Sequence, residues 1–216
     1  MPFLDLSHTI TDGMVTYPGL PGPTITDHLS YDDSRSHYAE GTEFHIAQID
    51  MVGNTGTYLD TPAHRWRGRN DLSAIALEQV AGLQGLVIRH AGPVLGPKLI
   101  AERDLTGVAV LFATGWSRHW GTDAYSPPGH PHVGEPLARA LAEAGPALVG
   151  IDSVNIDDTA SGDRPAHSIL LDAGILVVEH LTRLADLPDD GFEVFAVPVK
   201  VAGMGTFPVR AFARWD

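Results

Sequence analysis

Apolar runs of strand length alternate with two helical patterns in the second half of the chain, and this order restricts the fold more than any other feature. The helical segments are Pro136–Ala144, which stops at Gly145, and Pro165–Asp172, which is followed by Gly174. Pro in the first turn and Gly after the last turn are typical of helix ends. The apolar runs around them are Val108–Ala113, Ala147–Ile151 and Ile175–Val178. This alternation predicts an α/β fold with a mixed, partly parallel β-sheet and covering helices.

The rest of the chain is richer in strands than in helices. Further segments with strand composition are Phe44–Met51, Leu86–Arg89, Glu193–Val199 and Val209–Ala213. No repeat, low-complexity tract or linker divides the 216 residues, of which 44% are hydrophobic. A chain of this size can build one hydrophobic core. We therefore expect a single domain over residues 1–216.

The overall charge limits the partners of the chain. Its formal net charge is −13, from 27 acidic and 14 basic side chains. Such a surface repels phosphate backbones and anionic lipids, so neither nucleic acid nor a membrane is expected as a partner. The chain has no cysteine, no signal-peptide pattern at its N-terminus and no apolar run near the roughly 20 residues of a membrane helix. We expect a cytoplasmic protein that acts on a small molecule.

The densest polar cluster of the sequence spans residues 54–64 and follows the Phe44–Met51 strand. Side chains at even spacing share one face of an extended segment, and here they are Asn54, Tyr58, Asp60 and His64. An amide, a phenol, a carboxylate and an imidazole on one face are unusual for a structural strand. The structural alternative is a turn or helix cap at Asp60 with His64 on the surface, and spacing alone leaves both open.

Three more polar residues fall where the predicted parallel strands end or where a helix leads into them. Asp152 follows the strand that ends at Ile151, and Glu179 follows the strand that ends at Val178. His167 lies in the first turn of the helix that leads into the second of these strands. Reactive groups in α/β sheets collect at the carboxyl ends of strands. We therefore expect His167 and Glu179 to approach one another.

The segment 54–64 resembles the signature of the cyclase family, which includes bacterial kynurenine formamidases and isatin hydrolases. The family pattern is His-x-Gly-Thr-His-x-Asp-x-Pro-x-His. The agreeing positions are Gly56, Thr57, Asp60, Pro62 and His64. Asn54 and Tyr58 stand in place of the first two histidines. Other stretches that resemble the family, in the same order along the chain, are Asp5–Ile10, Tyr17–Gly19, Thr114–Ser117, Gly150–Ser153, and Ala166–His167 with Glu179.

The resemblance implies a swivelling β/β/α fold and a hydrolase site. By resemblance, Asp60, His167 and Glu179 are metal ligands and His64 transfers protons. Tyr17 lines the substrate pocket by resemblance, while Trp116 and Asn54 are further candidates for substrate contact. The resemblance also implies a homo-oligomer, a dimer or a tetramer.

Without the first two signature histidines, the metal ligands that the resemblance still implies predict metal-assisted hydrolysis. One imidazole and two carboxylates, from His167, Asp60 and Glu179, can hold a divalent metal such as zinc or manganese and leave positions open. Such a metal makes water more acidic, and His64 can transfer the water proton. The predicted substrate is a small cyclic or acyl amide, a lactone or an N-formyl compound.

Two alternatives remain open. The first is a metal-independent lactonase, ring-closing enzyme or dehydratase in which Tyr58, Asp60 and His64 form an acid/base set. In the metal-assisted mechanism, by contrast, Tyr58 would donate to a developing oxyanion, and Asn54 would do the same or orient Asp60. The second is a catalytically silent protein that binds a small ligand, which the replaced histidine positions 54 and 58 suggest.

Overall fold

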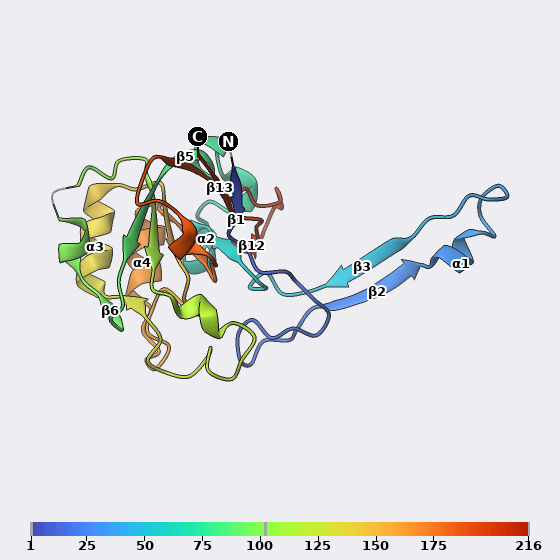
Figure 1. The fold of residues 1–216 in the computed structure, drawn as a ribbon, viewed down its shortest axis with the longest axis horizontal. Helices are drawn as coiled ribbons and strands as arrows, with labels where there is room; N and C mark the ends of the chain where they lie inside the picture. The colour runs from blue at the N-terminus through green and yellow to red at the C-terminus, as the bar shows by residue number, and fades with distance from the viewer. Residues whose placement is uncertain (1, 102, 216) are drawn as a thin grey trace.

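The computed structural model of the chain describes residues 2–101 and 103–215. Its centre is a nine-stranded sheet in the order β1-β13-β11-β5-β7-β9-β10-β4-β12 (Figure 1). In chain order these strands are β1 (Phe3–Asp5), β4 (Tyr58–Asp60), β5 (Ala81–Arg89), β7 (Ala109–Ala113), β9 (Leu148–Ile151), β10 (Leu176–Glu179), β11 (Phe192–Phe195), β12 (Thr206–Pro208) and β13 (Phe212–Arg214). The four strands β5, β7, β9 and β10 run parallel, and all other pairs in this sheet are antiparallel. The prediction of an α/β fold with a mixed, partly parallel sheet is confirmed.

The sheet curls on itself. β12 ends the strand order on one side, whereas β13, the next strand along the chain, is second from the other side. Between them, the Val209 N–H donates to the Thr57 carbonyl, and the Ala211 carbonyl accepts from the Leu6 N–H, each at 2.9 Å. The prediction of one continuous strand over Val209–Ala213 is therefore wrong, because this apolar run connects the two sides of the curled sheet.

Two helices, α3 (Glu135–Ala144) and α4 (Pro165–Asp172), cover one face of the parallel strands (Figure 1). α3 ends at Gly145, which has a φ of 67° and donates its N–H to the Leu141 carbonyl, as the sequence predicts. The shorter helices are α1 (Tyr31–Ser34) and α2 (Pro62–Arg65), and 3₁₀ turns occupy Leu72–Ala74, Leu77–Gln79, Pro97–Ile100, Trp116–His119 and Leu184–Asp186. None of the helices in the described ranges has the length and apolar character that a membrane crossing requires.

Residues along each central strand alternate between two apolar layers. On β7, Val110 and Phe112 pack in the layer that contains α3 and α4, and Leu111 packs in the opposite layer. On β10, Val177 joins the first layer. Each buried side chain of this size contributes about 1.5–3 kcal/mol. Apolar packing on both faces therefore fixes the strands whose ends carry the polar residues.

A separate two-stranded sheet extends away from this body (Figure 1). It consists of β2 (Thr24–Leu29) and β3 (Ile46–Asp50), with α1 near its tip. We call residues 24–50 the arm. The strand predicted at Phe44–Met51 is β3 and lies in the arm, outside the main sheet. A third small sheet joins β6 (Val94–Leu95) to β8 (His132–Val133).

Candidate active site

Asp60, the last residue of β4, is fully buried. β12 pairs with β4 so that Thr206 lies opposite Asp60, and the Thr206 hydroxyl donates to Asp60 Oδ1 at 2.5 Å. The other oxygen, Oδ2, has no hydrogen-bond partner among the described residues. It faces His167 Nε2 at 3.5 Å. Because a buried carboxylate oxygen without a donor is costly, this oxygen calls for a positively charged ligand.

His64 follows Asp60 on the short helix α2. Its Nδ1 lies 2.7 Å from the Thr206 hydroxyl oxygen. The Thr206 proton is directed at Asp60, so this oxygen accepts a hydrogen bond from the Nδ1–H of His64. In the neutral imidazole this leaves the lone pair on Nε2. The His64 side chain is 34% exposed, whereas the Asp60 side chain is fully buried. His64 is therefore accessible to a ligand from solvent.

Gly205 allows α2 to approach β12 closely. A Cβ at position 205 would lie 2.4 Å from the His64 backbone nitrogen and 2.6 Å from its Cα. Since these are backbone atoms, we expect Gly205→Ala to destabilise the protein by about 1–3 kcal/mol and to separate His64 from Thr206. Denaturant unfolding measures the decrease in the free energy of unfolding. Gly162→Ala is the matched control, because a Cβ there meets nothing within 4 Å. A Gly205→Ala variant as stable as this control would contradict the expectation.

The first turn of α4 brings His167 close to Asp60 and His64. The Asp157 carboxylate accepts the N–H groups of Ala166 and His167 at 2.6 and 3.0 Å, at the start of α4. It also bonds His167 Nδ1 at 2.7 Å. This contact holds the Nδ1 proton and directs Nε2 toward Asp60. A carboxylate behind an imidazole is the arrangement that orients metal-binding histidines in proteins.

Glu179, the last residue of β10, lies opposite Tyr58 of β4 and is buried. Its Oε1 accepts the Ile156 N–H at 2.6 Å and lies 3.6 Å from His167 Nε2. Its Oε2 accepts the Tyr58 hydroxyl at 2.5 Å. Burial, together with the charges of Glu179 and Asp60, raises the Tyr58 pKa well above its ordinary value. Tyr58 is therefore a neutral phenol whose proton is directed at Glu179.

Negative charge dominates this group of side chains. Burial lowers the pKa of His167, but the carboxylates of Glu179, Asp157 and Asp60 outweigh burial and raise that pKa to about 10. Burial raises the pKa of Glu179 to about 7, against the opposing effect of His167. Burial also acts to raise the pKa of Asp60, but His64 and His167 outweigh it and keep that pKa below its ordinary value. The site therefore attracts positive charge, either a proton or a metal ion.

Asp60, His64 and His167 each offer one ligand atom, and these atoms lie within 4.8 Å of one another. Glu179 is not in this group of three, although its Oε1 is near His167 Nε2. The unpartnered Asp60 oxygen and the oriented His167 nitrogen fit a divalent cation. The structure thus brings together the predicted residues Asp60, His64, His167 and Glu179.

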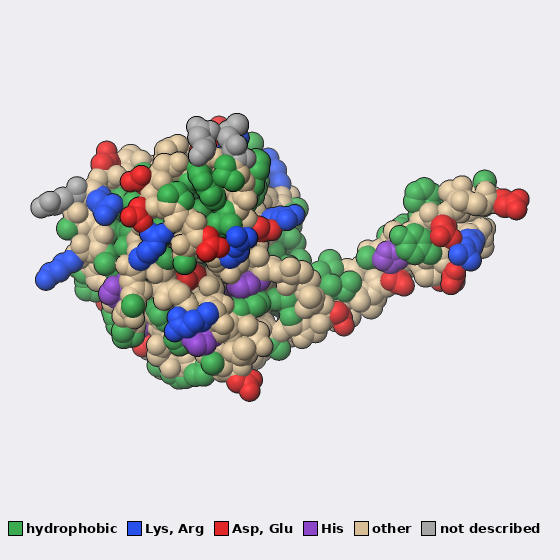
Figure 2. Space-filling model, in the orientation of Figure 1, with side chains coloured by type: hydrophobic (Ala, Val, Ile, Leu, Met, Phe, Trp, Pro, Cys, Tyr) green, Lys and Arg blue, Asp and Glu red, His purple; other side chains and the backbone are tan. Residues whose placement is uncertain are grey.

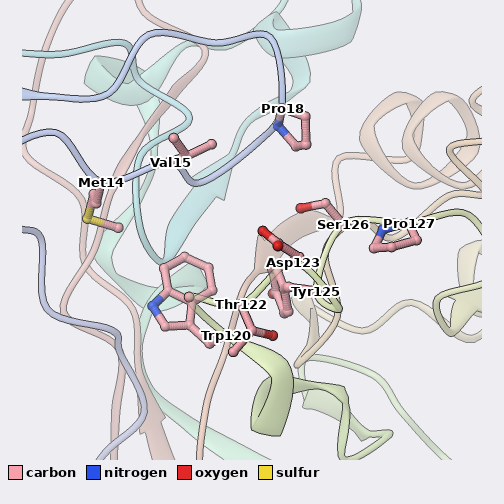
Figure 3. A pocket seen from close by; sticks show the side chains of 10 residues that line it. Met14, Val15, Pro18, Trp120, Thr122, Asp123, Tyr125, Ser126 and Pro127 are labelled. Carbon is pink, nitrogen blue, oxygen red and sulfur yellow. The ribbon is translucent and has the colours of Figure 1, made fainter.

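A cavity of about 720 Å³ lies between the loop before the arm and the segment 120–127 (Figure 3). Met14, Val15 and Pro18 form one side of it, and Trp120 and Tyr125 are aromatic residues of the other. The sequence pattern favours packing or a pocket wall for Trp120, whereas sequence reasoning gave no role to Tyr125.

The residues predicted to bind substrate have other surroundings. Tyr17 and Trp116 do not line the 720 Å³ cavity. The Trp116 indole N–H donates to the Tyr125 carbonyl at 2.9 Å, so it supports the cavity wall from behind. The Asn54 side chain approaches the Tyr58 hydroxyl. Asp152, predicted at a strand end, accepts the Thr114 and Gly115 N–H groups at 2.7 and 2.8 Å and so holds the loop that leads to this wall.

His180 connects the cavity wall to the buried group. It directly follows Glu179, and its Nδ1 lies 2.8 Å from the Tyr125 hydroxyl oxygen. Its ring centroid is 5.1 Å from that of Tyr58. Burial lowers the His180 pKa to about 3, so this imidazole is neutral. Sequence reasoning gave no role to His180 or Thr206, and it left only the end of a loop or a supporting role open for Asp157.

Comparison with known proteins agrees with this fold. The sequence profile of a family described as putative cyclase matches residues 4–158. The kynurenine formamidase of Salinibacter ruber is 28% identical over 99% of this chain and 98% of its own length. A structure described as a "Potential Metal-Dependent Hydrolase With Cyclase Activity" is 27% identical, has a TM-score of 0.78, and aligns over 98% of this chain and 96% of that one. Isatin hydrolase A from Labrenzia aggregata, bound to benzyl benzoate, shares the fold with a TM-score of 0.84 at 23% identity, over 98% of this chain and 93% of that one.

The fold, the site and these relatives define an enzyme of the hydrolase class, as the sequence predicts. The chain belongs to the cyclase family. The resemblance drawn from residues 54–64 is thereby confirmed. Asn54 and Tyr58 remain the positions at which this chain departs from the family signature.

Proposed function

We propose that this enzyme hydrolyses the C–N bond of a small cyclic, acyl or N-formyl amide. A divalent cation, zinc or manganese, would be held by Asp60, His167 and Glu179. The observation that carries the proposal is the buried, unpartnered Oδ2 of Asp60, which faces an imidazole oriented from behind by Asp157. The kynurenine formamidase of Salinibacter ruber, which aligns over nearly the whole chain, supports the amide class, with lactones as the related alternative.

When bound, a divalent cation supplies Lewis-acid chemistry, since it polarises a carbonyl and makes water more acidic. His64 accepts the proton of the attacking water at Nε2 and returns it to the nitrogen as the C–N bond breaks. Thr206 keeps the His64 ring in one tautomer, because its single hydroxyl proton is directed at Asp60. Tyr58 keeps Glu179 in position and remains protonated.

The 720 Å³ cavity is the proposed substrate pocket, with Trp120 and Tyr125 as apolar walls. We keep Tyr17 and Asn54 as candidates for contact with bound substrate. Trp116 acts by holding the Tyr125 backbone. A cytoplasmic homo-oligomer is part of the proposal, and the acidic, cysteine-free composition supports the cytoplasm.

The proposal is tested by an activity panel on purified enzyme, with an N-formyl arylamine, a cyclic amide and a lactone as substrates. Each is assayed after chelation and again after zinc or manganese is restored. We expect amide hydrolysis that chelation abolishes and the ion restores. Turnover of none of the amides by ion-loaded protein would contradict the proposal and favour a silent, ligand-binding protein.

Tyr58→Phe separates the metal-assisted mechanism from the metal-independent one. The substitution removes one hydrogen bond to Glu179, worth about 1.5 kcal/mol, so we expect kcat/KM to fall about tenfold. Activity measured with and without chelator checks this. A loss of a thousandfold or more, in an enzyme that chelators do not inhibit, would instead identify Tyr58, Asp60 and His64 as a metal-free acid/base set.

A further inference from the structure

His180 combines two features that cost free energy and that proton transfer by His64 does not explain. Figure 2 shows histidine side chains on the surface of the body and of the arm, whereas His180 is fully buried. Its φ of 55° lies in the left-handed region that residues other than glycine rarely adopt. Its ring nitrogen Nε2 is buried without a hydrogen-bond partner among the described residues. Backbone strain and unpaired buried polar groups both indicate a functional role.

Two hydrogen bonds hold the backbone of His180 in this conformation. The Thr57 hydroxyl donates to the His180 carbonyl at 2.6 Å, and the His180 N–H donates to the Ser153 carbonyl at 3.3 Å. Thr57 directly precedes Tyr58, which pairs with Glu179 across β4 and β10. The imidazole of His180 is therefore held in a fixed position beside this pair.

The contact with Tyr125 places the proton of the neutral His180 ring on Nε2. The Tyr125 hydroxyl lies 2.8 Å from His180 Nδ1, its one hydrogen-bond partner among the described residues. If the hydroxyl donates to Nδ1, only the Nε2–H of the ring lacks a partner. The reverse direction would leave both the Tyr125 proton and the Nε2 lone pair unpaired. The first arrangement costs less, so His180 presents an N–H donor.

This donor can take a role that the structure denies to Tyr58. The sequence makes Tyr58 a candidate donor to a developing oxyanion, but its hydroxyl proton is directed at Glu179. The His180 ring lies beside Tyr58, with ring centroids 5.1 Å apart. It also lies 5.5 and 5.8 Å from the rings of Trp120 and Tyr125, which line the 720 Å³ cavity. The unpaired N–H thus belongs to a ring between the cavity wall and the buried group.

We propose that the Nε2–H of His180 is the oxyanion donor of this site, an inference that rests on the proposed amide hydrolysis. As the water oxygen bonds to the carbonyl carbon, the π electrons move to the carbonyl oxygen and the water proton passes to His64. His180 donates a hydrogen bond to the charged oxygen and keeps its own proton. When the C–N bond breaks, the carbonyl re-forms and His64 returns the proton to the nitrogen. A donor that acts on developing charge raises kcat more than it lowers KM.

His8 has a similar unpartnered nitrogen but different surroundings. Its Nε2 is also buried without a partner among the described residues, and its ring stacks on Trp120 with centroids 3.9 Å apart. Its described hydrogen bond is made by the backbone N–H, to Thr57, so no contact fixes the ring tautomer. His8 lines another cavity, of about 440 Å³, beside Asp5 and Arg210. His8→Phe is therefore the matched control for His180.

Two replacements of His180 separate the Nε2–H donor from the contact with Tyr125. His180→Asn has an amide where Nδ1 lies and tolerates a left-handed backbone, but it has no group at the position of Nε2. His180→Gln reaches that position. With formanilide as substrate, we expect His180→Asn to lower kcat by about 10²–10³-fold at nearly unchanged KM. The kcat of His180→Gln should be about tenfold or more above that of His180→Asn, and His8→Phe should keep the wild-type kcat.

Circular dichroism checks that each variant is folded. A wild-type kcat in His180→Asn would overturn the proposal, as would a His180→Gln kcat no higher than that of His180→Asn. A loss of kcat in His8→Phe as large as that in His180→Asn would also overturn it, because both histidines contact Trp120.

Binding of a tetrahedral analogue gives a readout that does not depend on turnover. The hydrate of phenyl trifluoromethyl ketone has the geometry of the intermediate, whereas methyl phenyl ketone remains trigonal, and titration calorimetry measures both dissociation constants. We expect His180→Asn to weaken binding of the hydrate about tenfold or more and to leave binding of the trigonal ketone unchanged. Unchanged binding of the hydrate in His180→Asn, or a wild type that does not prefer the hydrate, would overturn the proposal. Binding of the hydrate that depends on His180, without turnover of any amide, would support the donor and contradict the proposed amide hydrolysis.

Discussion

His64→Ala is expected to lower kcat/KM for an amide substrate by about 10²–10⁴-fold, which is the usual contribution of one acid/base group. The reason is geometric: the Thr206 hydroxyl accepts the Nδ1–H of His64, which leaves Nε2 as the basic atom of a side chain that is 34% exposed. The bound cation should be retained, because Asp60 and His167 are unchanged. Steady-state kinetics and elemental analysis of the same preparation measure both quantities.

The control for this variant is His37→Ala, an exposed histidine on the arm. Unchanged turnover in His64→Ala would contradict the acid/base role. Loss of the metal together with activity would show that His64 is a ligand. That outcome is chemically reasonable, because one of its ring nitrogens lies within 4.8 Å of ligand atoms of Asp60 and His167.

His167→Ala is expected to destabilise the metal-free protein by about 3–5 kcal/mol at neutral pH, because it leaves buried carboxylates without a cation. The carboxylates that lose their partner are those of Asp60, Asp157 and Glu179. The raised pKa of His167 gives the pH dependence. Its stabilising effect is complete below the ordinary pKa near 6.5 and is lost as the pH rises through about 10. The difference between wild type and variant should therefore shrink between pH 7 and pH 10.

Denaturant unfolding over this pH range measures the effect. His132→Ala is the matched control, because the ring of this half-buried histidine makes one hydrogen bond among the described residues, with the His130 carbonyl at 3.2 Å. His132→Ala should lower the free energy of unfolding much less than His167→Ala at every pH. Equal losses in the two variants would show that the buried carboxylates of the site do not depend on His167 for their charge.

The sequence predicted the parts of the fold that local pattern determines. α4 has the predicted bounds, and α3 differs by one residue at its start, because Pro and Gly mark both ends. β10 was predicted because a short apolar run that follows Gly174 has the length of a buried strand and is too short for a helix. β4 was not predicted as a strand, since it has only three residues and pairs only with distant segments.

The site residues were predicted where they lie close together in the sequence. Asp60 and His64 lie in one contiguous segment, and His167 with Glu179 lie in one helix–strand unit. Thr206 is 146 positions from Asp60, and only the register of β12 against β4 brings them together. His180 and Tyr125 were missed for the same reason, since their contact depends on a loop that Asp152 holds.

The metal content of the purified chain tests the central claim most directly. Protein prepared without added metal or chelator is analysed for zinc and manganese beside an Asp60→Ala variant. We predict about one equivalent per chain in wild type, since one group of ligand atoms faces the unpartnered oxygen, and none in the variant. Wild-type protein that stays free of metal, even after incubation with zinc and manganese, would contradict the account and leave Tyr58, Asp60 and His64 to act without a metal.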